Sequence, residues 1–135
     1  DVWKDCGTAE ALLDTNRYLL ENDSHNDVRP AGSIVRPPVF ISPDAQIEDS
    51  IIGPYVYIGP GCRVKGSVIG PYVSMAPGAT VEQAILRDSI VNEDAHIDCA
   101  LLSESLVGQH ALVRGGFERL NVGDSSEIES RGLIL

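Results

Sequence analysis

The sequence predicts an all-β fold, a solenoid in which short parallel strands stack coil upon coil. Apolar residues recur after six, six and then five residues, which fits neither the 3.6-residue period of a helix nor the two-residue period of a two-sided strand. Three successive units of seventeen residues begin at Val35, Ile52 and Ile69. One position of the unit stays small over five units, as expected where backbones crowd; its occupants are Ala45, Cys62, Ala79, Ala95 and Ala111.

The repeat runs from Val35 to at least Phe117 and predicts five to six coils. Each segment has apolar residues at its first and fifth positions, and we expect both to point into a triangular prism. The segments begin at Val35, Ile41, Ile47, Ile52, Ile58, Val64, Ile69, Met75, Val81, Leu86, Val91, Ile97, Leu102, Val107 and Val113. Because Cys62 lies in the column of small residues, we expect a core residue and not a reactive thiol.

Gly-Pro pairs at 53–54, 59–60 and 70–71 mark places where the chain turns a corner. The segments IGPGCR, VGQHAL and VGDSSE resemble the hexapeptide repeat of left-handed β-helices. That resemblance implies a left-handed parallel β-helix, although most parallel crossovers are right-handed. The last of the three segments begins at Val122 and predicts a further partial coil beyond Phe117.

A helix is predicted before the solenoid, from Thr8 to Asn22. Thr8 is the predicted N-cap and Glu10 lies in the first turn. The expected apolar stripe is Leu12, Asn16, Leu19 and Leu20. A helix this short is marginal alone, so it needs a surface to pack on. The polar stretch from Asn22 to Pro30 reads as a loop.

Composition excludes several classes of function. A formal net charge of −10 disfavours nucleic acid and anionic membranes as partners. No apolar run approaches the roughly 20 residues of a membrane span, and no signal peptide is visible. Three scattered cysteines without a CxxC pair indicate a reducing compartment, and we expect a cytoplasmic protein. Since the sequence opens at Asp1 without an initiator Met, we expect a piece of a longer protein.

The opening WKDCGTAEALLDTNRYLLE resembles a segment near the end of the catalytic domain in sugar-1-phosphate nucleotidylyltransferases. In that family a Trp-x-Asp-x-Gly-Thr motif is followed by a Leu-Leu-x-x-Asn-Arg helix. These enzymes join a nucleoside triphosphate to a sugar-1-phosphate and release pyrophosphate, and long forms of glucose-1-phosphate thymidylyltransferase continue into a left-handed β-helix. The resemblance implies that residues 1–30 are the final helix and linker of a missing catalytic domain, and that 31–135 are the β-helix domain.

By the same resemblance Asp5 is a ligand of the catalytic Mg²⁺, a hard cation that prefers carboxylate oxygen and bridges phosphates. The family's usual Thr after this Asp is Cys6 here. The glycine-rich, arginine-containing nucleotide loop and the first metal-binding Asp of the family are missing from the 135 residues. We therefore expect Mg²⁺ in the intact parent, no cofactor in this chain, and no nucleotidyl transfer by this chain alone.

Two other enzyme classes share the predicted fold. Acyltransferases with hexapeptide repeats bind coenzyme A and use a histidine base, for which His96 and His110 are the candidates. The long loop that usually leaves a coil in those enzymes is missing here. A zinc-dependent carbonic anhydrase needs three convergent histidines, and His25 lies outside the solenoid. A third possibility, compatible with the nucleotidylyltransferase, is a β-helix that oligomerises or regulates its parent.

Aromatic residues on the first coils predict a contact surface. Phe40 and Tyr57 share one outward column, and Tyr55 and Tyr72 share another. Stacked aromatics make a contiguous patch, which typically marks a contact. Two surfaces could cover this patch: the predicted helix, if it folds back onto the solenoid, or a neighbouring subunit. Since symmetric homo-oligomers are common, and similar proteins often form trimers, we expect a homo-oligomer, a trimer over a dimer, with these four residues at or near the interface.

Overall fold

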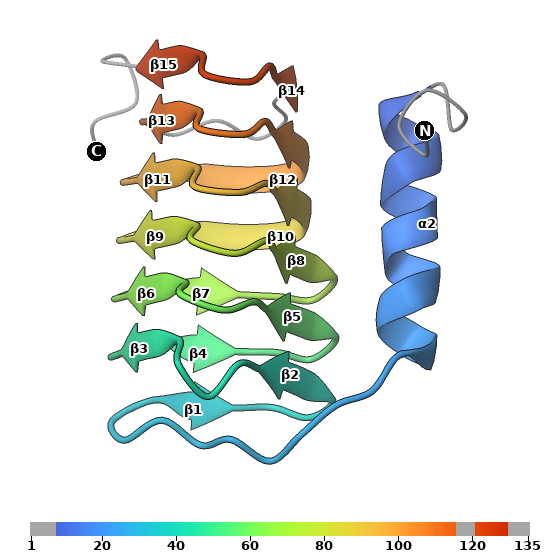
Figure 1. The fold of residues 1–135 in the computed structure, drawn as a ribbon, viewed down its shortest axis with the longest axis vertical. Helices are drawn as coiled ribbons and strands as arrows, with labels where there is room; N and C mark the ends of the chain where they lie inside the picture. The colour runs from blue at the N-terminus through green and yellow to red at the C-terminus, as the bar shows by residue number, and fades with distance from the viewer. Residues whose placement is uncertain (1–7, 116–120, 130–135) are drawn as a thin grey trace.

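The chain folds as a left-handed parallel β-helix of about five turns with one helix beside it, in a computed structural model that describes residues 8–115 and 121–129. The predicted fold class is confirmed. Coils stack along one axis from β1 to β15, and α2 (Ala9–Asn22) lies along one side of the stack (Figure 1). The helix begins beside the later coils and ends beside the first.

Each of the first five coils contributes one short strand to each of three faces. The first face contains β1 (Ile34–Val35), β4 (Ile51–Ile52), β7 (Val68–Ile69) and the first halves of β10 (Ile85–Val91) and β12 (Leu101–Val107). The second contains β2 (Val39–Ile41), β5 (Val56–Ile58), β8 (Val73–Met75), the second halves of β10 and β12, and β14 (Asn121–Val122). The third contains β3 (Gln46–Glu48), β6 (Arg63–Lys65), β9 (Thr80–Glu82), β11 (His96–Asp98), β13 (Leu112–Arg114) and β15 (Glu127–Glu129).

All described strand pairs are parallel, and their register follows the length of the repeat. Ile51 pairs with Val68 and Ile52 with Ile69, seventeen residues on. Where the fourth unit has sixteen residues, Leu86 pairs with Leu102. The predicted extra coil is present, because β14 pairs with β12 and β15 pairs with β13.

The core is a column of aliphatic side chains inside the prism. The first residues of the segments are buried as predicted, including Ile52, Ile58, Ile69, Met75, Val81, Leu86 and Ile97, each 0% exposed. The small column is confirmed for Cys62, Ala79, Ala95 and Ala111, all at most 1% exposed, while Ala45 at the open end is partly buried. Burial is the main cause that raises the pKa of the Cys62 thiol, as expected of a core residue.

The prediction that every fifth-position residue points inward is wrong for the five-residue segments. There the fourth residue enters the core instead, and it is small: Ser50, Ser67, Ala84, Ser89, Ala100 and Ser105. The apolar fifth residue then faces outward; these residues are Ile51, Val68, Ile85, Ile90, Leu101 and Leu106. A segment that is one residue shorter has less chain to turn its corner, so the side-chain alternation shifts by one position.

The buried serines satisfy their polar atoms locally. The Ser67 hydroxyl donates to the carbonyl of Lys65 at 2.9 Å and accepts from the amide of Ala84 at 3.1 Å. The Ser50 hydroxyl donates to Glu48 and accepts from the amide of Ser67 in the same way. These bonds explain why serine is tolerated inside the prism.

The Gly-Pro corners have a steric cause. Gly53 has a φ of 104°, and a Cβ there would lie 2.0 Å from the carbonyl oxygen of Arg36 in the preceding coil. Only glycine allows coils to approach this closely at the corner.

Helix α2 begins as predicted, because the Thr8 hydroxyl accepts from the amide of Ala11 at 3.1 Å. The predicted stripe is partly wrong. Leu13 and Asn16 are the buried residues of the helix, whereas Leu19 is 53% exposed. The packed face runs through Leu13, Asn16 and the half-buried Leu20, at the spacing of one side of a helix, and Leu19 lies at the edge of that face. In the described part of the chain, no helix has the length and apolar character needed to cross a membrane.

The loop after α2 covers the open edge of the first coil. The Asn26 side chain donates to the carbonyl of Ile41 at 2.8 Å and accepts from its amide at 3.1 Å. The Asn26 amide also donates to the carbonyl of Val39 at 3.0 Å. These bonds occupy groups of β2 that would otherwise be available to another strand.

Candidate functional site: the junction of helix and solenoid

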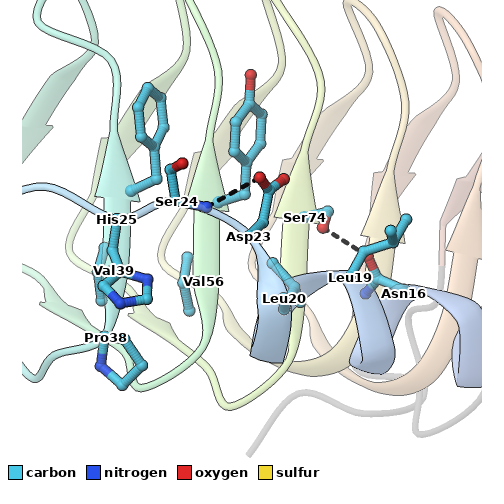
Figure 2. A pocket seen from close by; sticks show the side chains of 12 residues that line it. Asn16, Leu19, Leu20, Asp23, Ser24, His25, Pro38, Val39, Val56 and Ser74 are labelled. Carbon is cyan, nitrogen blue, oxygen red and sulfur yellow. Dashed lines mark hydrogen bonds between the residues drawn. The ribbon is translucent and has the colours of Figure 1, made fainter.

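The outward side chains of the second face form the surface on which α2 packs. The helix contacts β8, β10 and β12. Asn16, 8% exposed, is the polar centre of this junction. The Ser74 hydroxyl donates to Asn16 Oδ1 at 2.5 Å (Figure 2). Asn16 Nδ2 donates to the carbonyl of Tyr72 at 3.5 Å. Leu106 is 7% exposed although it is an outward residue of β12.

Charged pairs flank this centre. Arg17 Nε donates to Asp88 Oδ1 at 2.8 Å, and the same guanidinium pairs with Asp14 on its own helix. Asp88 has a φ of 47° and stands at the corner between the two halves of β10. The bond to Asp88 is the main cause that raises the pKa of Arg17. The helix is therefore fixed at one rotation against the solenoid.

The four predicted aromatic residues form two stacked pairs on adjacent coils. Phe40 and Tyr57 have ring centroids 5.1 Å apart with planes at 10°, and Tyr55 and Tyr72 are 5.0 Å apart at 4°. The Tyr72 hydroxyl donates to Glu21 Oε2 at 2.8 Å, which raises the Tyr72 pKa. The sequence analysis offered two surfaces that could cover this patch, the helix or a neighbouring subunit. The bond from Tyr72 to Glu21 shows that α2 contacts the patch at Tyr72.

A cleft of about 290 Å³ lies where the end of α2 leaves the second face (Figure 2). Its floor comes from β2, β5 and β8, through Val39, Val56 and Ser74, and the loop residues Asp23, Ser24 and His25 form its rim. Phe40 and Tyr57 also line it. Apolar walls with a few polar groups at one edge have the chemistry of a small-molecule or side-chain pocket.

The other candidate residues do not come together with this junction. Asp5, the predicted metal ligand, lies outside the described residues. His96 and His110 are on the surface, 3.9 Å from the carboxylates of Glu82 and Asp94 respectively, with side chains 42% and 58% exposed. Within residues 8–115 and 121–129, no three His, Cys, Asp or Glu side chains gather as a metal site.

Sequence reasoning missed two features that the structure brings forward. One is the contact that Asn16 and Arg17 make with the solenoid. The position of Asn16 within the predicted apolar stripe was a signal of it, because a polar residue on a packed face needs a hydrogen-bond partner. The other is a row of outward aliphatic residues on the first face, which the five-residue spacing could have signalled, because it is in those segments that the inward position shifts.

Fold and repeat together define a β-helix of the hexapeptide-repeat type. Residues 49–83 match the family model described as bacterial transferase hexapeptide (six repeats). The match supports a transferase-type left-handed β-helix over those residues, which span the end of the first coil, the whole second coil and most of the third. A search of curated proteins found no match for the chain.

Proposed function

We propose that this chain is the C-terminal part of a sugar-1-phosphate nucleotidylyltransferase, a glucose-1-phosphate thymidylyltransferase in the first instance. In this proposal residues 1–30 end the catalytic domain and residues 31–135 form a scaffold that holds the catalytic domains in an oligomer. The parent would make a nucleotide sugar and pyrophosphate with Mg²⁺, partly held by Asp5. The scaffold alone would carry no nucleotidyl transfer.

One observation carries the proposal. The resemblance to the catalytic domain includes a Leu-Leu-x-x-Asn-Arg helix, and the Asn and Arg of that motif are Asn16 and Arg17. These two residues bond to the solenoid through Ser74, Tyr72 and Asp88. A helix whose sequence resembles the end of that catalytic domain is thus attached to the β-helix by its polar side chains. Such an attachment suits a scaffold that fixes the position of a catalytic domain.

The oligomer is part of the same proposal. A homo-oligomer, a trimer over a dimer, would bring catalytic domains together around the solenoids, with Phe40, Tyr55, Tyr57 and Tyr72 at or near the contact. The stacking of both aromatic pairs supports a continuous surface there. Since Tyr72 already bonds to Glu21, the surface left to a neighbour centres on the other three.

A coenzyme A-dependent acyltransferase is the second candidate, favoured by the match of residues 49–83 to the bacterial transferase hexapeptide model. In that case His96 or His110 would act as the base. Turnover of acetyl-coenzyme A with amine or hydroxyl acceptors, abolished in His96→Ala or His110→Ala, would favour this candidate.

The coding sequence upstream of Asp1 tests the proposal. A glycine-rich loop followed by Arg and Lys, within a nucleotide-binding domain, is the expected finding. An upstream region without that loop, or one that encodes an unrelated domain, would contradict the proposal.

A further inference from the structure

One row of outward residues on the first face is entirely aliphatic. Its members stack directly on one another: Ile34 pairs with Ile51, Ile51 with Val68, Val68 with Ile85, and Ile85 with Leu101. We call this row the aliphatic ladder; it consists of Ile34, Ile51, Val68, Ile85 and Leu101. Neighbouring rungs lie one strand spacing apart, so the ladder is a straight apolar strip along the solenoid.

Four of the five rungs are exposed, and Ile51 is half-buried. Ile34 is 56% exposed, Ile85 48% and Leu101 47%, and Val68 is also exposed. Large exposed apolar residues elsewhere in the described part of the chain are Tyr18 and Leu19, both on α2. Isolated exposed aliphatics need no explanation, but a contiguous row of them typically marks a contact surface.

Charge distinguishes the first face from the third. The ladder and the parallel outward column beside it contain no carboxylate; that second column is Arg36, Gly53, Gly70, Arg87 and Ser103. By contrast, one outward column of the third face contains three carboxylates, interspersed with two cations; in order it is Glu48, Lys65, Glu82, Asp98 and Arg114. Copies with a formal net charge of −10 repel one another, so a contact between them has to avoid carboxylates.

We propose that the aliphatic ladder is the surface through which copies of this chain associate. This assignment rests on the oligomer in the proposed function and moves the centre of its interface from the aromatic patch to the first face. The stacked Tyr55–Tyr72 pair stands at the corner between the first and second faces, so the ladder continues the surface on which those residues lie.

A second copy is the occupant that these observations favour. An identical ladder has the same rung spacing and can match it rung for rung along its whole length. Helix α2 does not cover the ladder, because its bonds to Ser74 and Asp88 hold it on the second face.

Light scattering of the 135-residue chain tests the assignment. In the variant Val68→Lys/Leu101→Lys, two rungs that are not neighbours gain a charge that would be buried in the contact. The matched control Thr80→Lys/Leu112→Lys makes the same change of charge at two outward positions of the third face. We expect oligomers for the wild type and the control, and monomers for the ladder variant with its β circular dichroism unchanged.

A milder variant covers the case in which the ladder variant fails to fold. Ile85→Thr keeps a β-branched residue and should raise the dissociation constant of the oligomer about tenfold, as loss of a central contact residue typically does. An oligomer that is unaffected by either folded variant would overturn the ladder as interface and leave the proposed function standing. A monomeric wild type at high micromolar concentration would overturn the ladder as well, and pyrophosphate release by the longer protein would still report separately on the parent.

Discussion

The narrowest position inside the prism is the column of small residues, and Ala79 lies at its middle. Ala79 is fully buried, with Cys62 and Ala95 in the coils on either side. Backbones of three coils converge there, so a larger side chain has no room to expand into. The size of this residue, more than its polarity, decides whether the coils can stack.

Replacing Ala79 by Leu should therefore destabilise the chain by about 1–3 kcal/mol through overpacking. The same change at Lys65, an exposed outward residue of β6, should be nearly neutral, since its neighbours Glu48 and Glu82 are themselves at the surface. Thermal or urea unfolding of both variants measures the difference. Equal stabilities would contradict the register of the repeat.

Asn26 has an equally local task at the open edge of the first coil, where it is half-buried. Asn26→Ala removes two side-chain bonds to Ile41 and should cost about 1–3 kcal/mol, because the backbone groups of β2 lose their partners. Asp27→Ala, at the exposed neighbouring residue, is the control. Urea midpoints that fall equally in both variants would show that Asn26 has no special role.

Sequence could predict the inward position in six-residue segments but not in five-residue ones. Ala79 and Val81 were identifiable because the six-residue spacing preserves the alternation of the strand. Ala84 and Ile85 were assigned the wrong way round, since a shorter segment turns its corner one residue earlier and puts the small residue inside. The same displacement hid the aliphatic ladder, because four of its members were expected in the core as fifth-position residues: Ile51, Val68, Ile85 and Leu101.

Among the elements, α2 is the one that depends most on tertiary contacts. Fourteen residues are too few for a stable isolated helix, and its buried side chains are Leu13 and Asn16. Sequence identified its start correctly because Thr8 is an N-cap, a signal that is local. Its packed face could not be predicted, since that face depends on where Ser74 and Asp88 lie on a partner distant in sequence.

The junction can be tested with a pair of variants on neighbouring helix positions. Asn16→Ala removes the bonds to Ser74 and Tyr72, so α2 should detach more often and its amides should exchange with solvent about tenfold faster or more. Thr15→Ala is the control, because its hydroxyl bonds only to Ala11 within the helix. Hydrogen exchange at residues 12–20 gives the readout. Equal protection in both variants would mean that the polar contacts do not hold the helix.

For the whole molecule, the central claim is that a scaffold and the end of a catalytic domain are joined in one chain. The fold and the family match over residues 49–83 support the β-helix alone. The part of the claim that concerns a catalytic domain is the proposal made above, drawn from the resemblance of the opening segment and from the docked helix. The catalytic part of the claim depends on Asp5, whose role follows from the resemblance of the opening segment. Activity, and not structure of the solenoid, is therefore what decides it.

The most direct measurement is pyrophosphate release by the longer protein, with nucleoside triphosphates and sugar-1-phosphates in the presence of Mg²⁺. Wild-type protein should turn over, the 135-residue chain should not, and Asp5→Asn should lower turnover by orders of magnitude while the β circular dichroism stays unchanged. Full activity of Asp5→Asn would remove Asp5 from the metal site. A longer protein that releases no pyrophosphate with any such pair would contradict the account itself.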